Sequence, residues 1–226
     1  MKRKKTDRAK QLIFLAAVVG LILYSGNQAL LRLNQALRPH VEKIAFSEVR
    51  NAATRVIRQA VGELDLDPQQ LIHISRDSSG AITEIQYDTG QLNALMSESL
   101  AAAQASLNAA EQGEEDPHTR MVYYDKGIIY SMPLGMLTGS ALLAGVGPEM
   151  ELRMRAVNSL TGQIEARSSA YGLNSTLLQI DMTLSVEMLV ISPLLLDSLQ
   201  VDVRIPLVVQ IIQGQIPSLM TGVISG

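Results

Sequence analysis

The feature that most constrains this chain is a run of 20 residues without a charged side chain, from Leu12 to Leu31. At about 1.5 Å per residue, a helix of that length spans the roughly 30 Å hydrocarbon layer of a bilayer. Eleven of these residues are Leu, Ile, Val or Phe, and together they favour insertion by about 3–7 kcal/mol, against the polar Asn27 and Gln28 near one end. The run therefore predicts a transmembrane anchor over residues 12–31.

A cleaved secretory signal also has a basic start and an apolar run, but it needs small residues at both recognition positions of its cleavage site. Tyr24-Ser25-Gly26 and Asn27-Gln28-Ala29 lack that pattern, which favours a retained signal anchor. Residues 1–10 hold six Lys or Arg against one Asp. By the positive-inside rule, residues 1–11 are expected to be a cytoplasmic basic tail, and residues 32–226 the extracytoplasmic domain of a single-pass membrane protein.

The composition of the rest of the chain excludes several classes of function. Outside the first ten residues there are 13 basic and 21 acidic residues, so the body would repel nucleic-acid phosphates and no nucleic-acid partner is expected. The absence of cysteine excludes disulfides, thiolate metal sites and a cysteine nucleophile. The three histidines, at His40, His73 and His118, are scattered. No metal site or cofactor is expected.

Two segments are patterned as amphipathic helices. Pro39 is expected to interrupt any helix that continues from the anchor, because its ring removes a donor and clashes one turn back. From Val41 to Leu64, apolar residues recur mostly at steps of three and four. A second apolar face runs from Leu92 to Ala110, behind a capping-box-like start formed by Asp88 and Gln91. Each helix is expected to pack through its apolar face.

Most of the remaining chain is patterned as β structure. A hairpin is predicted from strands at Leu71–Ser75 and Ala81–Tyr87. From Met121 almost to the end, apolar and polar residues alternate, most clearly over 149–156, 178–190 and 199–205, and proline is expected to bend or stop the strands at Pro193, Pro206 and Pro217. One-sided strands form an antiparallel sheet with one wet face. The fold class predicted is therefore α+β, with an N-terminal transmembrane helix followed by an antiparallel sheet packed with two long amphipathic helices.

The motifs of common enzyme classes are absent. There is no nucleophile elbow, zinc-binding histidine pair or Walker loop. Gly145-Val146-Gly147 has Met150 at the third glycine position of a dinucleotide loop. The acids of the predicted surface loop from Gly113 to Thr119 lack the ligand spacing of a calcium site.

Two pairs of carboxylates are candidates for sugar hydrolysis, Asp181 with Glu187 and Asp197 with Asp202. Asp181 and Glu187 would be about 20 Å apart on one extended strand, which is too far to act on one bond. All four are interpreted as solvated strand residues. The chain is predicted not to be an enzyme, with no catalytic, cofactor-binding or metal-binding residues.

Residues 131–148, SMPLGMLTGSALLAGVGP, resemble the signature of the YunB family of sporulation proteins. Supporting matches are Gly172-Leu173-Asn174, Ile205-Pro206-Leu207 and Gly214-Gln215-Ile216-Pro217. The likeness covers nearly the whole chain and departs at Met136 and Ala141, where a polar residue and a proline are expected. It implies a membrane-associated protein of endospore-forming bacteria, made in the mother cell and needed for efficient spore formation. It implies no catalytic residues.

The signature segment is also a candidate interaction loop. Its glycines and prolines predict a tight, irregular connection that folds back on the sheet. Its apolar side chains would be costly to expose without a use, although burial in the core is their commoner fate. The candidate residues are Pro133, Leu134, Gly135, Leu137, Gly139, Leu142, Leu143, Gly145, Gly147 and Pro148.

The leading hypothesis is a non-enzymatic assembly or interaction module in the mother-cell or outer forespore membrane. Its expected partners are membrane lipid, through the N-terminal helix, and proteins of the spore envelope. The alternative is a lipid-binding module with an apolar cavity between sheet and helices, for which methionine would be an adaptable lining at Met150, Met154, Met182 and Met188. A third class, a cell-wall hydrolase, would need an acid and a base that no motif supplies.

Overall fold

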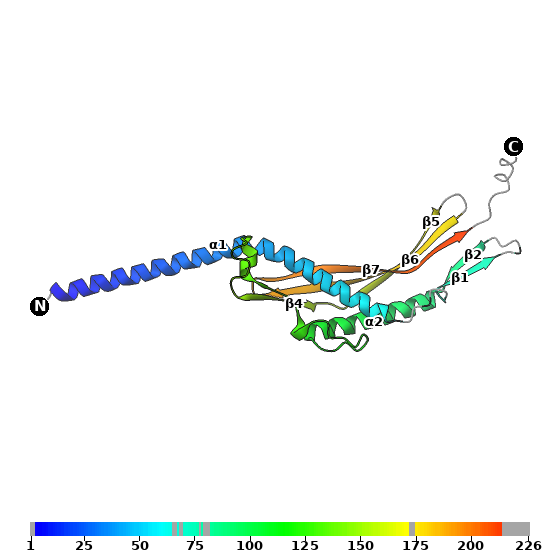
Figure 1. Cartoon of the computed structure of the whole chain (residues 1–226), viewed down its shortest axis with the longest axis horizontal. Coiled ribbons are helices and arrows are strands. Elements are labelled where there is room, and N and C mark those ends of the chain that lie inside the picture. The colour runs from blue at the N-terminus through cyan, green and yellow to red at the C-terminus, as the bar shows by residue number, and fades with distance from the viewer. Residues whose placement is uncertain are drawn as a thin grey trace, which may run out of the picture.

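The computed structural model describes residues 3–64, 67, 70–76, 78, 82–171 and 175–213. Two helices and two antiparallel sheets make up the α+β fold that the sequence predicts (Figure 1). In chain order the elements are α1 (Arg3–Gly62), β1 (Ile72–Arg76), β2 (Ile82–Tyr87), α2 (Thr89–Gln112), η2 (Asp125–Gly127), β3 (Ile128–Pro133), η3 (Leu134–Thr138), β4 (Glu149–Ala156), β5 (Thr161–Tyr171), β6 (Ser175–Ser192) and β7 (Leu195–Gln213).

Strand β6 is the central strand of the five-stranded sheet and pairs with β4, β5 and β7. Along one edge it pairs with β7 over its whole length, from Ser192 opposite Leu195 to Ser175 opposite Gln213. The other edge is shared, because β5 pairs with residues 175–185 and β4 pairs with residues 188–191. Strand β3 lies outside β4. The sheet therefore has two different ends, with β3 and β4 at one and β5 at the other. Strands β1 and β2 form the separate hairpin that was predicted.

The alternation of apolar and polar residues along β6 places the apolar side chains on one buried face, as predicted. The even-numbered side chains face the helices, and each of these is no more than 2% exposed: Leu178, Ile180, Met182, Leu184, Val186, Met188 and Val190. Strand β4 follows the same rule with Met150, Leu152 and Met154. Burial of one face of each strand removes most of its apolar surface from water, and this fixes the register of the sheet.

The prolines of the sheet mark its irregular points. Pro193 lies in the two-residue turn between β6 and β7. Pro206 lies at a bulge, where Asp181 is opposite Pro206 but Ile180 is opposite Val208, so that Leu207 is an extra residue. A bulge suits proline because its ring cannot donate to the ladder. The extra residue reverses the parity of β7, from Val201 and Val203 on the buried face to Val208 and Ile212. Pro217 lies outside the described residues.

The expectation that Pro39 interrupts the helix is wrong, because α1 continues through it from Arg3 to Gly62. Pro39 is exposed, so water can solvate the carbonyl one turn back that loses its hydrogen bond. The usual result of an internal proline is a kink, and α1 changes direction partway along (Figure 1). The helix also crosses both predicted segment boundaries, at residues 11–12 and 31–32. In the part of the chain that the structure describes, no helix is long and apolar enough to cross a membrane.

Helices α1 and α2 pack on each other and on the sheet through small side chains. The buried face of α1 includes Val41 and four alanines, and that of α2 includes Ser99 and Ser106 among its alanines. The predicted cap of α2 is confirmed, since Asp88 Oδ1 accepts a hydrogen bond from Gln91 N at 2.9 Å. Gly113 ends α2 with a φ of 72°. The two serines were not predicted as core, because a lone serine on an apolar face resembles a solvated position.

Candidate interaction loop

The candidate loop joins two neighbouring antiparallel strands, β3 and β4. Pro133 and Glu149 are directly opposite each other at the end of this ladder. Beyond it, Leu134 N donates to Pro148 O at 3.0 Å and Gly135 N donates to Val146 O at 2.9 Å. These two bonds close the base of the loop, so it is an ordered extension of the β3–β4 hairpin.

Glycine is required at the base of the loop. A Cβ on Gly135 would lie 1.8 Å from Leu143 O and 2.4 Å from Val146 O, both of them backbone atoms. Gly139 and Gly147 have φ values of 70° and 108°, which side chains other than glycine rarely adopt. Gly145 differs, because a Cβ on this residue would meet nothing within 4 Å. The loop is therefore tight and irregular, with open space at its far side.

The structure divides the apolar residues of the loop into two groups. Leu137 is buried and Leu134 packs against the core. Four others are 45–91% exposed, and we call them the apolar tip: Met136, Leu142, Leu143 and Val146. Leu142 is the most exposed, at 91%. Only some of the apolar side chains of the segment are therefore buried in the core.

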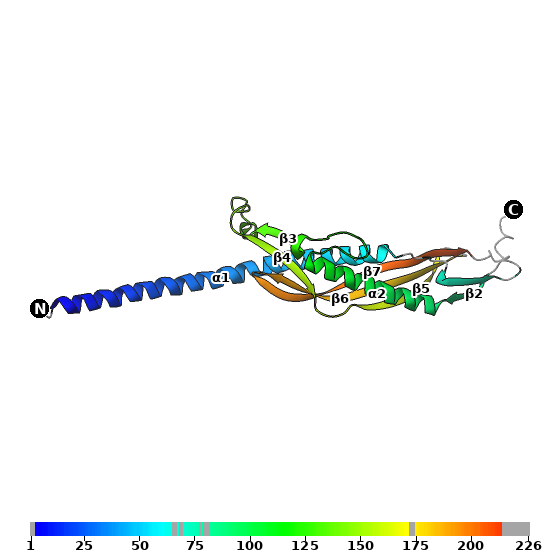
Figure 2. The same cartoon turned by 90° about the horizontal axis from the view of Figure 1, so that it is seen from below.

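The loop lies at the end of the sheet from which the N-terminal part of α1 departs. Figures 1 and 2 show the green loop there in both views. Helix α1 contacts η3, and Leu37 of α1 packs against the same core as Leu134. Leu196, exposed just after the β6–β7 turn, was not predicted as part of any surface. From Ile191 near this end to Ser175 at the other, β6 extends about 50 Å.

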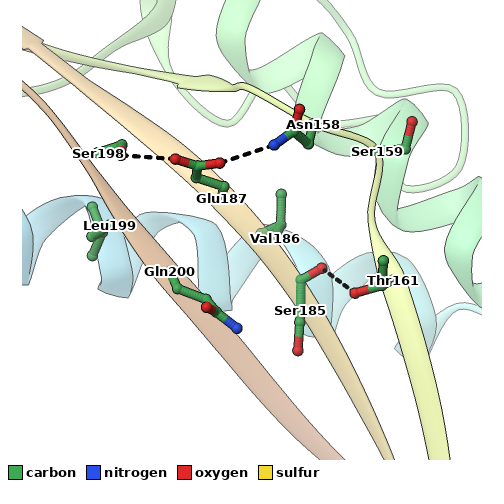
Figure 3. A pocket seen from close by; sticks show the side chains of 9 residues that line it. All are labelled: Asn158, Ser159, Thr161, Ser185, Val186, Glu187, Ser198, Leu199 and Gln200. Atoms are coloured by element: carbon green, nitrogen blue, oxygen red, sulfur yellow. Dashed lines mark hydrogen bonds between the residues drawn. The ribbon is translucent and has the colours of Figure 1, made fainter.

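A polar hollow of about 300 Å³ lies elsewhere on the sheet, where the edge of β6 passes from β4 to β5. Glu187 is at its centre, and its carboxylate accepts hydrogen bonds from Asn158 Nδ2 at 2.9 Å and Ser198 Oγ at 2.8 Å (Figure 3). The residues that line it are Asn158, Ser159, Thr161, Ser185, Val186, Glu187, Ser198, Leu199 and Gln200. Among these described lining residues Glu187 is the single titratable group, so the hollow offers no acid–base pair.

The prediction of a solvated carboxylate is wrong for Asp181, which is 5% exposed and forms an ion pair and hydrogen bond with Arg204. It lies at the bulge, opposite Glu165 of β5 on one side and Pro206 of β7 on the other. Asp197 accepts from Ser198 N at 2.8 Å and Asp202 from Gln200 Nε2 at 3.1 Å. Within the described ranges, no three His, Asp or Glu residues are grouped as a metal site.

Asp116 lies in the segment that was predicted as a surface loop, yet it is fully buried. Its carboxylate accepts hydrogen bonds from His118 N at 2.9 Å and Thr119 Oγ1 at 2.8 Å. Burial raises the pKa of Asp116, but these bonds and the hydroxyl groups of Ser106 and Tyr123 outweigh it and bring the pKa below its ordinary 3.8. Both hydroxyl groups are buried, but within the described part of the chain neither has a hydrogen-bond partner at ordinary distance and angle. Burial in turn raises the pKa of Tyr123 to about 12.

We expect this cluster to stabilise the fold above about pH 4 and to lose that contribution as the pH falls further, because the depressed pKa means that the folded state binds the proton less well than the unfolded state. Asp116→Asn should lower the free energy of unfolding by about 1–3 kcal/mol near neutral pH. The difference from the unmodified chain should shrink in acid, as measured by urea unfolding at several pH values. Asp202→Asn, at an exposed strand position, is the matched control. A difference that stays constant with pH would contradict this account.

Comparison with known proteins gives two matches. A family model described as Sporulation protein YunB matches residues 129–219, a range that includes the loop and strands β4 to β7. The chain is also 25% identical to Sporulation protein YunB of Bacillus subtilis (strain 168) over 223 residues, which cover 97% of this chain and 85% of the other. No solved structure matches the chain. The resemblance inferred from residues 131–148 is confirmed.

Proposed function

Because this chain resembles sporulation protein YunB along almost its whole length, we propose that it acts in spore formation. In this proposal it is a non-enzymatic, membrane-anchored protein whose α+β domain lies outside the cytoplasm. It serves as an assembly or interaction module in the mother-cell or outer forespore membrane, with proteins of the spore envelope as partners. The observation that carries the sporulation role is the 25% identity over 97% of the chain.

The support for an anchor comes from the sequence. Residues 12–31 carry no charge, and the basic residues before them favour a cytoplasmic N-terminus. Helix α1 is continuous from these residues into the domain, so it would join membrane and domain without a flexible linker.

The support for an interaction module comes from the surface. The apolar tip has exposed side chains on a closed loop, whereas the nine residues that line the polar hollow include one titratable group, Glu187. The lipid-cavity alternative has less support. A side chain that lined a channel for an acyl chain would keep accessible surface, and the seven buried residues of β6 keep at most 2%.

Two lysines in the anchor should abolish the role in sporulation. Each lysine near the centre of the span costs about 2.5–3.5 kcal/mol, so Val19→Lys with Ile22→Lys would offset most or all of the favourable insertion energy. In an endospore-forming host, deleting the gene should lower the number of heat-resistant spores, and the double-lysine variant should not restore it. Fractionation should find that variant outside the membrane fraction.

Val19→Ala with Ile22→Ala is the matched control, and it should restore both membrane association and spore number. In intact protoplasts of non-sporulating cells that express the gene, where the cell membrane is the one membrane present, added protease should digest the domain of the unmodified protein. An unchanged spore count after deletion would refute the role in sporulation. Full protection of the domain from protease would refute the proposed orientation.

A further inference from the structure

We propose that the apolar tip inserts into the headgroup layer of the same membrane that α1 enters, so that the domain has a second contact with lipid. This inference rests on the membrane anchoring proposed above. It concerns Met136, Leu142, Leu143 and Val146, whose exposed side chains project from one loop.

The chemistry of the loop suits lipid. From Gly127 to Pro148 there is no charged side chain, and the first charged residues on either side are Lys126 and Glu149. A protein-binding surface usually surrounds its apolar centre with polar and charged groups. Here, apart from the buried Leu137, the residues between Met136 and Val146 that are not part of the tip are Gly, Ala, Ser and Thr.

The backbone prevents these side chains from folding back on the core. Leu134 N and Gly135 N hold the base through Pro148 O and Val146 O. Two further bonds, from Leu143 N to Ser140 O at 3.1 Å and from Val146 N to Leu143 O at 2.9 Å, hold the far side. The tip is therefore ordered in a conformation that leaves its apolar groups in solvent until something covers them.

The position of the loop identifies what covers it. The loop lies beside α1 at the end of the sheet where the N-terminal part of that helix departs (Figures 1 and 2). Leu37 of α1, which packs against the core, follows the end of the uncharged run at Leu31 by about 9 Å of helix. The polar layer on each side of a bilayer is roughly 5–8 Å thick. The loop is thus within reach of the headgroups, whereas the end near Tyr171 is not.

A single tryptophan can test this contact, because the chain has none. Leu142→Trp places the probe on the tip, and Val146→Trp provides a second probe on the same loop. Tyr171→Trp is the matched control, since this exposed aromatic residue lies at the far end of β5. The full chain would be reconstituted into phosphatidylcholine and phosphatidylglycerol vesicles, with and without lipids brominated at a shallow position of the acyl chain.

We expect the emission of both tip probes to shift to the blue and to be lost with brominated lipid, while the Tyr171→Trp probe remains accessible to iodide in water. If the chain floats with the vesicles but the tip probes stay accessible to iodide, the inference is overturned and the anchor stands, and a protein would then be the occupant of the tip. If the chain does not float with the vesicles, the proposed anchor fails and this inference fails with it.

Discussion

Replacing Leu184 by alanine is expected to lower the free energy of unfolding by about 2–5 kcal/mol. Leu184 has no exposed surface and lies in the middle of β6, opposite Val203 of β7 and Gly162 of β5. Both neighbouring strands and the helices above close around it, so the cavity cannot collapse easily. The change should be measured on the full chain in detergent, by urea unfolding followed by circular dichroism.

Leu196→Ala makes the same chemical change at a side chain that is 70% exposed. Its effect should stay within about 0.5 kcal/mol, because surface substitutions rarely disturb packing. Equal losses for the two variants would mean that the even-numbered face of β6 does not form the core.

Gly135→Ala is expected to open the loop while leaving the sheet intact. The new methyl group would meet two backbone carbonyl oxygens, and backbone atoms cannot move aside without breaking the bonds from Leu134 N and Gly135 N. Loss of two hydrogen bonds corresponds to about 1–3 kcal/mol. Amide hydrogen exchange should become faster at Leu134 and at residue 135, the two donors of these bonds, and proteases should cleave the loop more readily.

Gly145→Ala is the matched control within the same loop, because its added methyl group meets nothing within 4 Å. It should leave amide exchange in the loop unchanged and can stabilise the chain slightly by restricting the unfolded state. Both variants replace one glycine of the loop by alanine, but only Gly135→Ala should break the bonds that close its base. A difference in exchange between them would therefore report on closure of the loop. A Gly135→Ala variant with unchanged exchange would contradict the closed base.

The strands and helix faces could be predicted because each depends on a local period. Alternation over 178–190 identifies the buried face of β6, and Asp88 with Gln91 identifies the start of α2. The predictions that were wrong concern residues whose environment depends on tertiary contacts. Asp181 is buried because a bulge and two neighbouring strands cover it, and that pairing is not visible along the chain. Pro39 lies within α1 at an exposed position, so the tendency of proline to end a helix did not end this one.

The candidate loop was predicted only in part, for a related reason. Glycine spacing indicated an irregular connection, but it could not separate Leu137, which is buried, from Leu142, which is not. That division depends on which side of the loop faces α1 and the sheet. The buried Asp116 was missed because its partners, His118 and Thr119, are residues that are usually found in solvent.

The length of the central strand β6 also sets the distance between the two ends of the sheet. The apolar loop lies at one end of β6, and Tyr171, the last residue of β5, lies at the other. A partner bound near Tyr171 would therefore be held roughly 50 Å from the point where α1 leaves the sheet. Adding two residues to each of β6 and β7 would lengthen that spacing by about 7 Å and keep the same side chains inside. Adding one to each would turn the apolar face outward. Where the pairing stays regular, the length of this sheet therefore changes in steps of two residues.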